Sequence, residues 1–309
     1  MDSRQLRYFA AIYEAQSVSR AAEGLNIAAS ALSHHLNNLE AELATSLFLR
    51  KPRGMQPTAA GERLYDHARG ILRAITAATD DLQEEGREIT GDVSVGMSYS
   101  AVKAIGVDLM KTVINDYPKL RLSLSESLSG SMLVHLMSSE IDMAVVYNPP
   151  NDPKLRTQPI LEEEMVCVGR RDIIGDTDDP VTFQELLEMP LILLRQGLSA
   201  RALLDDASLL KQLESRARLQ MNSVQAIAGC LVDGLGCIVG TRLFMRELLD
   251  EGTLHARPIV EPTLTRTLYI CEQADRPATF ASEAVRQMIM KMIFEAMRSG
   301  RWDASPTAS

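Results

Sequence analysis

Residues 17–43 read SVSRAAEGLNIAASALSHHLNNLEAEL and predict two helices joined by a tight turn. The first helix is short, opens on a serine N-cap and carries the small residues Ala21 and Ala22, which let another helix approach closely. Gly24 can take the left-handed conformation that ends this helix. A longer helix begins at about Ala28, and leucines at steps of four, three and four residues mark its buried face: Leu32, Leu36, Leu39 and Leu43. The segment therefore predicts a helix-turn-helix.

The flanking residues extend this pattern to a winged domain. Leu6, Phe9 and Tyr13 recur at helical spacing and predict an earlier helix that packs on the pair. Residues 50–54, Arg-Lys-Pro-Arg-Gly, form a basic turn of the kind that contacts phosphates or the minor groove. An ordinary three-helix bundle with a solvated basic loop is the alternative. The position of the basic turn just past the longer helix favours the wing.

The net charge of the chain argues against a nucleic-acid partner, but the distribution of charge along the chain is compatible with one. The net charge is −9, but the first sixty residues carry six basic and five acidic side chains, so the excess acid lies further along the chain. A composition of 46% hydrophobic and 24% charged residues is globular, and 309 residues predict two or three domains. No apolar run reaches the length of a membrane span and the N-terminus lacks a signal peptide, so we expect a cytoplasmic protein with no membrane partner.

The four cysteines do not form a recognisable metal or redox motif. Cys167, Cys230, Cys237 and Cys271 are scattered within apolar runs. Neither a CxxC pair nor a zinc spacing occurs, so we expect reduced, buried thiols. The sequence predicts neither a metal nor a cofactor.

A long helix is predicted after the basic turn. Thr58 can cap it, and it can continue to about Glu88. Apolar residues recur at steps of four, three, four, three and four, the heptad spacing of a coiled-coil dimer: Leu64, Ala68, Ile71, Ile75, Ala78 and Leu82. Packing of this helix on its own domain is the alternative. Paired DNA-binding domains bind two half-sites, so a dimer predicts an inverted-repeat operator.

From Gly91 the pattern changes to alternating strands and helices, which predicts a parallel sheet covered by helices. A second series of strands and helices begins near Met165. A helix of about 279–298 closes the fold. We expect the last eleven residues, from Ser299, to be disordered.

Hydroxyl and amide groups gather in loops that follow several of these strands. Ligands of open α/β sheets bind beyond the carboxyl ends of strands, and helix N-termini with serine hydroxyls suit a small organic anion such as a carboxylate. Arg195 could supply the countercharge, although each serine alone could be an ordinary N-cap. The predicted effector-binding residues are Ser98, Tyr99, Ser100, Ser127, Gly130, Ser131, Arg195, Gln196, Ser199, Asn222 and Ser223.

Seven separate motifs agree in order and spacing with one protein family. They are residues 6–9 (LRYF), 17–23 (SVSRAAE), 31–33 (ALS), 39–43 (LEAEL), 47–50 (LFLR), 53–54 (RG) and 58–61 (TAAG). Through these motifs the chain resembles the LysR-type transcriptional regulators. Residues 64–69 (LYDHAR) and 142–147 (DMAVVY) are similar to the nitrogen assimilation control subgroup of that family.

The resemblance implies an α/β multidomain protein. It would have a winged helix-turn-helix domain (1–58), a linker and dimerisation helix (59–89) and a two-lobed effector-binding domain like the periplasmic binding proteins (90–309). Lobe I would comprise about 90–162 and 267–298, and lobe II about 163–266. The resemblance further implies a regulator and not an enzyme, with double-stranded DNA, a second copy of the chain and RNA polymerase as partners. A tetramer is a further expectation from the family.

The base-reading helix departs from the family's pattern. Recognition helices of the family usually begin with a Gln-Pro pair, where this chain has Ala29 and Ser30. Alanine can contact a thymine methyl, but it cannot make the bidentate contact to adenine that glutamine makes. The predicted DNA-binding residues lie on the side of the helix away from the leucines and in the basic turn: Ala29, Ser30, Ser33, His34, Asn37, Arg50, Lys51 and Arg53.

Several other functions compete with an effector-controlled regulator. An enzyme is disfavoured because Gly234 and Gly236 lack the third glycine of a dinucleotide loop, and no P-loop, hydrolase elbow or HExxH occurs. A redox sensor of the same family would carry a reactive cysteine pair near 195–208, where this chain has none. A stand-alone solute-binding protein is disfavoured by the N-terminal domain and the missing signal peptide. A regulator with no small-molecule inducer stays open.

Overall fold

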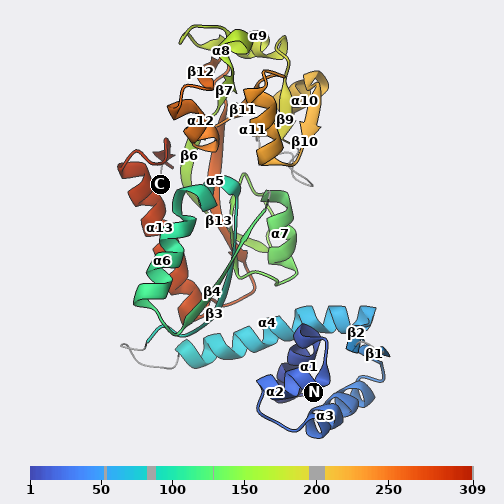
Figure 1. Cartoon of the computed structure of the whole chain (residues 1–309). Coiled ribbons are helices and arrows are strands. Elements are labelled where there is room, and N and C mark those ends of the chain that lie inside the picture. Colours follow the sequence, from blue (N-terminus) through green and yellow to red (C-terminus); the bar gives the residue numbers. More distant parts are fainter. Residues whose placement is uncertain (52–53, 82–87, 128, 195–205, 308–309) are drawn as a thin grey trace. The chain divides into compact units, whose positions relative to one another are not determined.

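The computed structural model describes residues 1–51, 54–81, 88–127, 129–194 and 206–307, which form two compact units (Figure 1). The first unit contains the N-terminal helices and a small hairpin, and the second is an α/β unit. None of the described helices combines the length and the apolar character needed to span a lipid bilayer. The fold class expected from the sequence is confirmed.

The first unit is a winged helix-turn-helix domain that continues into a long helix. Its elements are α1 (Ser3–Ala15), α2 (Val18–Gly24), α3 (Ala29–Glu42), β1 (Phe48–Lys51), β2 (Gly54–Pro57) and α4 (Ala59–Asp81). The leucine face of α3 is buried in one core with Leu6 and Phe9. Ala21 and Ala22 are buried where α2 packs against α1 and α3, so the small side chains allow the close approach that the sequence predicts.

Asn26, and not Gly24, is the left-handed residue in the turn between α2 and α3. Gly24 ends α2 without a positive φ, whereas Asn26 has a φ of 54°. Asparagine tolerates this conformation better than most residues because its short polar side chain can bond locally. The expectation for Gly24 is therefore wrong by two residues.

The β1–β2 hairpin is held against the turn that follows α1. The carbonyl of Gln16 accepts a hydrogen bond from the backbone N–H of Met55 at 2.9 Å. Gly54 has a φ of 130°, and a Cβ atom there would lie 2.5 Å from the same carbonyl oxygen. The hairpin therefore needs glycine at this position both for its backbone conformation and for the close approach.

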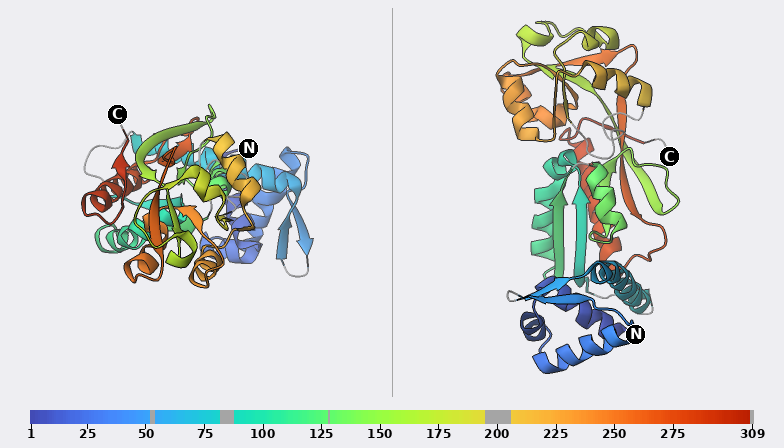
Figure 2. Two further views of the ribbon diagram at one scale, coloured as in Figure 1. Left: turned by 90° about the horizontal axis from the view of Figure 1, so that it is seen from above. Right: turned by 90° about the vertical axis from the view of Figure 1, so that its right-hand side faces the viewer.

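The first lobe of the second unit is built on a six-stranded sheet with the order β14-β6-β13-β5-β3-β4. Figures 1 and 2 show its strands β3, β4 and β13 between helices, seen from different sides. Its strands are β3 (Gly91–Met97), β4 (Leu120–Glu126), β5 (Met143–Tyr147), β6 (Leu155–Glu164), β13 (Thr265–Gln273) and β14 (Ser305–Pro306). β3 runs parallel to β4 and β5, whereas β13 runs antiparallel to β5 and β6. The expected parallel sheet is thus correct for one half and wrong for the other, and β6 is a strand that the sequence analysis missed.

Helices cover both faces of this sheet. They are α5 (Tyr99–Ala101), a π-helical turn η1 (Val102–Gly106), α6 (Val107–Asp116), α7 (Ser129–Met137) and α13 (Phe280–Arg298). Every residue of β5 is buried: Met143, Val145 and Tyr147 pack in one core with α6 and α13, and Ala144 and Val146 pack in another with α7. A strand covered on both faces is apolar throughout and does not alternate, which explains the unbroken apolar run in the sequence.

The second lobe contains a four-stranded sheet, β11-β7-β12-β8, and a two-stranded sheet, β10-β9. Its strands are β7 (Val166–Gly169), β8 (Val181–Thr182), β9 (Ile192–Leu194), β10 (Leu219–Met221), β11 (Ile238–Gly240) and β12 (His255–Val260). Its helices are α8 (Arg171–Ile174), α9 (Phe183–Leu187), α10 (Ala207–Arg216), α11 (Val224–Val232), the 3-10 turn η3 (Arg242–Met245) and α12 (Arg246–Asp250). The predicted capping box of α9 is present, with Thr182 and Glu185 each accepting a backbone N–H of the other.

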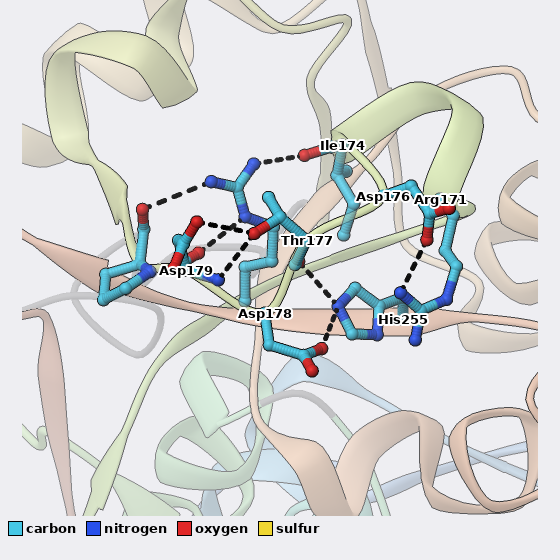
Figure 3. A network of polar contacts seen from close by, with 9 residues as sticks. Arg171, Ile174, Asp176, Thr177, Asp178, Asp179 and His255 are labelled. Atoms are coloured by element: carbon cyan, nitrogen blue, oxygen red, sulfur yellow. Dashed lines mark hydrogen bonds and ion pairs between the residues drawn. The ribbon is translucent and has the colours of Figure 1, made fainter.

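A loop of the second lobe, residues 175–180, is held by two side chains of β12 (Figure 3). His255 Nε2 lies 3.0 Å from the carbonyl oxygen of Thr177 and 3.1 Å from the carboxylate of Asp178. Arg257 donates hydrogen bonds to three backbone carbonyls, those of Ile174, Asp179 and Pro180. These bonds satisfy backbone carbonyls in and beside the loop. The carboxylates of its aspartates also have partners within the lobe, because Asp176 pairs with Arg171 and Asp179 accepts a hydrogen bond from the Thr177 hydroxyl.

The described C-terminal segment, residues 299–307, packs on the first lobe. Trp302 is only 1% exposed and packs in the core of the first lobe, and β14 pairs with β6. The indole N–H of Trp302 donates to Oε1 of Glu163 at 2.5 Å. The expectation of disorder from Ser299 is wrong for residues 299–307, because one large buried side chain anchors this segment to the sheet.

Glu163 and Arg266 form a buried ion pair where β6 and β13 adjoin the second lobe. Their side chains are 0% and 8% exposed, and Arg266 Nε lies 2.9 Å from Glu163 Oε2. The guanidinium carbon lies 3.6 Å from the centroid of the Tyr147 ring. Arg266 Nη2 also donates to the hydroxyls of Ser100, in the first lobe, and Thr241, in the second. One guanidinium therefore links both lobes.

Candidate DNA interface and effector cavity

The predicted base-reading residues form the solvent-facing side of α3, opposite its buried leucines. Four of them, Ala29, Ser30, His34 and Asn37, are exposed, and Ser33 is half-buried. His34 Nε2 lies 3.1 Å from the side-chain nitrogen of Asn38. A helix surface of this kind offers hydroxyl, amide and imidazole groups to base edges in a major groove.

The neighbouring histidine has a different environment. His35 is half-buried, and its ring centroid lies 5.0 Å from that of Tyr8 in α1. This contact places His35 at the edge of the helical core, and the His34 ring meets it edge to face with the centroids 6.4 Å apart. Among the described residues, no group of three or more His, Cys, Asp or Glu side chains could hold a metal ion.

The wing is tied to the base-reading helix by one carboxylate. Glu40, near the end of α3, accepts hydrogen bonds from the backbone N–H groups of Leu47 (2.6 Å) and Phe48 (3.2 Å). Phe48 opens β1, on which Arg50 and Lys51 are exposed. These two bonds thus fix the strand that carries Arg50 and Lys51 relative to α3. Arg53 lies outside the described residues.

The predicted coiled-coil seam on α4 divides into two parts. Ala68 is 0% exposed in the core of its own unit and Leu64 is half-buried, so Ala68 cannot contact a second chain while this core is intact. The first half of α4 therefore packs on its own domain, which is the alternative to a dimer seam that the sequence left open. Ile71 and Ile75 are 40% and 41% exposed, and Ala78 is also exposed. Leu82 lies outside the described residues.

Two tyrosines explain why the first half of α4 packs on its own domain. The rings of Tyr13 in α1 and Tyr65 in α4 are stacked, with centroids 3.8 Å apart. The hydroxyl of Tyr65 donates to Glu14 at 2.8 Å. Burial and this bond raise the pKa of Tyr65 well above its usual value. The contacts join α1 to α4, so that among the described seam positions Ile71, Ile75 and Ala78 stay exposed.

The second unit contains a cavity of about 630 Å³ between its two lobes. The first lobe contributes side chains from the α5–η1 segment and from the β4–α7 junction. The second lobe contributes α11 and the η3–α12 segment. The lining residues are Tyr99, Lys103, Glu126, Ser127, Ser131, Asn222, Val224, Gln225, Ala228, Phe244, Met245, Glu247 and Leu248. None of the residues labelled in Figure 3 is among them.

Four of the predicted effector-binding residues line this cavity, namely Tyr99, Ser127, Ser131 and Asn222. Others have structural roles. Ser98 is 5% exposed, Ser100 accepts a hydrogen bond from Arg266, and the Ser223 hydroxyl caps α11 by accepting the N–H of Ala226. Gly130 lies in the first turn of α7. Arg195, Gln196 and Ser199 lie outside the described residues.

The charged side chains of the cavity and the aromatic residue Phe244 were not predicted from the sequence. Lys103 follows Tyr99 by one helical turn, and Gln225 follows Asn222 by three residues, so helical spacing from the predicted residues could have indicated both. Phe244 and Glu247 come from a segment with no motif of its own. Only the fold brings that segment to the cavity.

The charges of the cavity are partly paired. Lys103 Nζ lies 2.5 Å from Glu247 Oε2 and donates to the backbone carbonyl of Phe244 at 3.3 Å. The bond from Lys103 lowers the pKa of Glu247. The Tyr99 and Phe244 rings meet edge to face with centroids 5.4 Å apart. Burial raises the pKa of Tyr99, and the carboxylates of Glu247 and Glu126 raise it further.

Comparison with known families accounts for both units. Residues 3–62 match the bacterial regulatory helix-turn-helix proteins of the lysR family, and residues 86–293 match the LysR substrate binding domain. The chain belongs to the LysR family. Its relatives include the nitrogen assimilation regulatory protein nac of Klebsiella aerogenes, 31% identical over 95% of each chain. The nac protein of Escherichia coli K12 is 29% identical over 98% of this chain and 99% of that protein.

Solved structures show the same fold for this LysR protein. A full-length OxyR variant from Pseudomonas aeruginosa superposes with a TM-score of 0.73 at 20% identity, over 95% of this chain and 94% of that one. CbnR complexed with its target DNA superposes with a TM-score of 0.58 at 18% identity, over 96% and 100% of the two chains. The relatives are transcriptional regulators, so the resemblance seen in the sequence is confirmed: this chain is a LysR-type DNA-binding regulator, not an enzyme.

Proposed function

We propose that this LysR regulator binds an inverted-repeat operator as a dimer or tetramer and that a small molecule in the cavity between its lobes modulates the binding. The observation that carries the DNA-binding part is the exposed polar side of α3, fixed through Glu40 beside the basic strand β1. Two such units on one dimer would read two half-sites, with α3 in the major groove and the wing on the backbone. The protein would act in the cytoplasm, where bacterial DNA lies, and contact RNA polymerase there.

The cavity supports the regulatory part of the proposal. It is lined from both lobes, so an occupant would favour one lobe geometry over another and could shift the equilibrium of the assembly. The mixture of aromatic, apolar and polar side chains fits a small organic molecule. A regulator without an inducer is the alternative, and it predicts the same operator footprint with and without every molecule that binds the cavity.

Removal of the wing charge should weaken all DNA binding. For Lys51→Ala we expect lower affinity for specific and unrelated duplexes alike, and a slope of log affinity against log salt that is smaller by about 1, since one fewer phosphate is neutralised. Fluorescence anisotropy with DNA from upstream of its own gene, at several salt concentrations, measures both. Lys211→Ala, at an exposed lysine of α10 in the other unit, is the matched control. An unchanged slope in Lys51→Ala would remove this wing contact from the proposal.

A charge on the exposed part of α4 should disrupt the dimer. Ile75 is 41% exposed on the described surface and occupies a seam position, so Ile75→Glu would place two carboxylates in the apolar interface of paired helices. We expect the dissociation constant of the dimer to rise at least tenfold, measured by analytical ultracentrifugation. Thr76→Glu adds the same charge one residue away, on the outer side of the heptad, and should not have this effect. A dimer that is equally stable in both variants would refute the α4 seam.

A further inference from the structure

The cavity between the lobes has a charge pattern that its serine-rich loops do not suggest. Among the described residues, three charged side chains line it: the cation Lys103 and the carboxylates Glu126 and Glu247. Lys103 already pairs with Glu247 at 2.5 Å and uses a second proton for the carbonyl of Phe244. The one cation among the described lining residues therefore already has two partners within the protein, and the net charge of these lining residues is negative.

Glu126 carries this surplus. It is the last residue of β4, at the carboxyl end of a strand, where ligands of α/β sheets bind. Its side chain is exposed, and no cation of the described part of the chain pairs with it. The carboxylate is thus available to a positively charged group in the cavity.

The aromatic residues of the cavity favour the same kind of ligand. Tyr99 and Phe244 meet edge to face, and a ring face attracts a cation within about 6 Å of its centroid. Lys103 Nζ already lies 5.7 Å from the centroid of the Tyr99 ring. Apolar lining from Val224, Ala228, Met245 and Leu248 adds a surface for hydrocarbon.

Through Lys103, the binding of such a ligand would change a contact between the two lobes. Lys103 lies in η1, a π-helical turn between α5 and α6, and turns of this kind are frequent at functional sites. Its partners Glu247 and Phe244 belong to the second lobe, so the pair joins the lobes across the cavity. A ligand cation near Glu126 and Glu247 would compete with Lys103 for this contact.

We infer that the cavity binds a small organic amine, an ammonium group attached to an apolar or aromatic body, and not the small carboxylate that the serine-rich loops suggest. The inference rests on the proposed role of the cavity as the effector site. An anion placed there would approach Glu126 and find Lys103 already paired. An ammonium group would be attracted both by the carboxylate of Glu126 and by the ring faces of Tyr99 and Phe244.

The experiment compares three probes that share a phenyl ring and a two-carbon chain: phenethylamine, phenylacetate and 2-phenylethanol. Isothermal titration calorimetry on the full chain should give the amine at least tenfold higher affinity than either other probe. Its binding should weaken with added salt, because the attraction is electrostatic. Glu126→Gln should lower the affinity for phenethylamine about tenfold and leave 2-phenylethanol unaffected, since only the charge is removed. Glu214→Gln, at an exposed carboxylate of α10 outside the lining, is the matched control.

Equal or tighter binding of phenylacetate would overturn the amine inference and leave the cavity as an effector site. Unchanged amine affinity in Glu126→Gln would overturn it as well. If none of the three probes bound, the amine inference would fail, and the effector role of the cavity would still be decided by the operator footprint with other small molecules that bind there. Salt-sensitive DNA binding, measured on the same protein, would still stand and would separate this result from a failure of the DNA-binding proposal.

Discussion

Glu163→Leu is expected to destabilise the second unit by about 3–5 kcal/mol, because it leaves a buried guanidinium without its counter-ion. Arg266 is 7% exposed overall, and Glu163 is its only carboxylate partner among the described residues. The stacking on Tyr147 and the two hydroxyl acceptors cannot offset the lost charge. Differential scanning calorimetry of the full chain measures the loss as a lowered melting temperature of this unit.

Two further variants isolate the cause. The double variant Glu163→Leu with Arg266→Met removes both charges, and it should recover much of the lost stability because no unpaired charge stays buried. Glu164→Leu alters the next residue of β6, whose side chain is exposed on the other face of the strand, and should change the melting temperature little. A single variant as stable as the unmodified protein would show that the pair is dispensable.

Trp302→Ala should cost the same unit about 3–5 kcal/mol, through the cavity left by a fully buried indole. The indole fills the core of the first lobe and donates its N–H to Glu163. Trp302→Phe keeps most of the ring and loses this bond, so it should cost less, about 1–3 kcal/mol for the unpaired carboxylate oxygen. Calorimetry measures both variants. Equal losses would contradict the packing role of the ring, and an unchanged stability of Trp302→Phe would contradict the role of the hydrogen bond.

Fluorescence gives an independent check on the C-terminal segment. Trp302 is the one tryptophan of the sequence, so the intrinsic emission of the protein reports this site alone. A buried indole predicts blue-shifted emission and weak quenching by acrylamide in the folded protein. Emission like that of free tryptophan would show that the segment from Ser299 does not occupy the core.

Local features of the fold could be predicted from the sequence because their causes are local. The leucines of α3 repeat with the helical period, so their common burial follows from geometry. Thr58 and Thr182 cap the helices that the sequence assigned to them, since a cap depends on residues within one turn. The wing likewise follows from its basic residues and its glycine. These features were enough to indicate the family.

The candidate sites were less predictable because they depend on distant contacts. Ala68 fits a heptad as well as any other apolar residue, and only packing against α1 and its neighbours removes it from the seam. Ser100 lies in a loop of the kind that binds ligands, but its hydroxyl accepts a hydrogen bond from Arg266. A serine that binds a ligand and one that binds a neighbouring side chain look the same in sequence.

The sequence by itself determined the winged helix-turn-helix, the long helix after it and the α/β character of the remainder, because periodicity, capping and turn residues act within a few positions. The folded chain alone joined Trp302 to Glu163, which are 139 residues apart, and brought Glu126, Lys103 and Glu247 around one cavity. Such contacts have no period in the sequence. They arise where separate strands and helices meet, and there the burial of charge and of aromatic surface decides which side chains become partners.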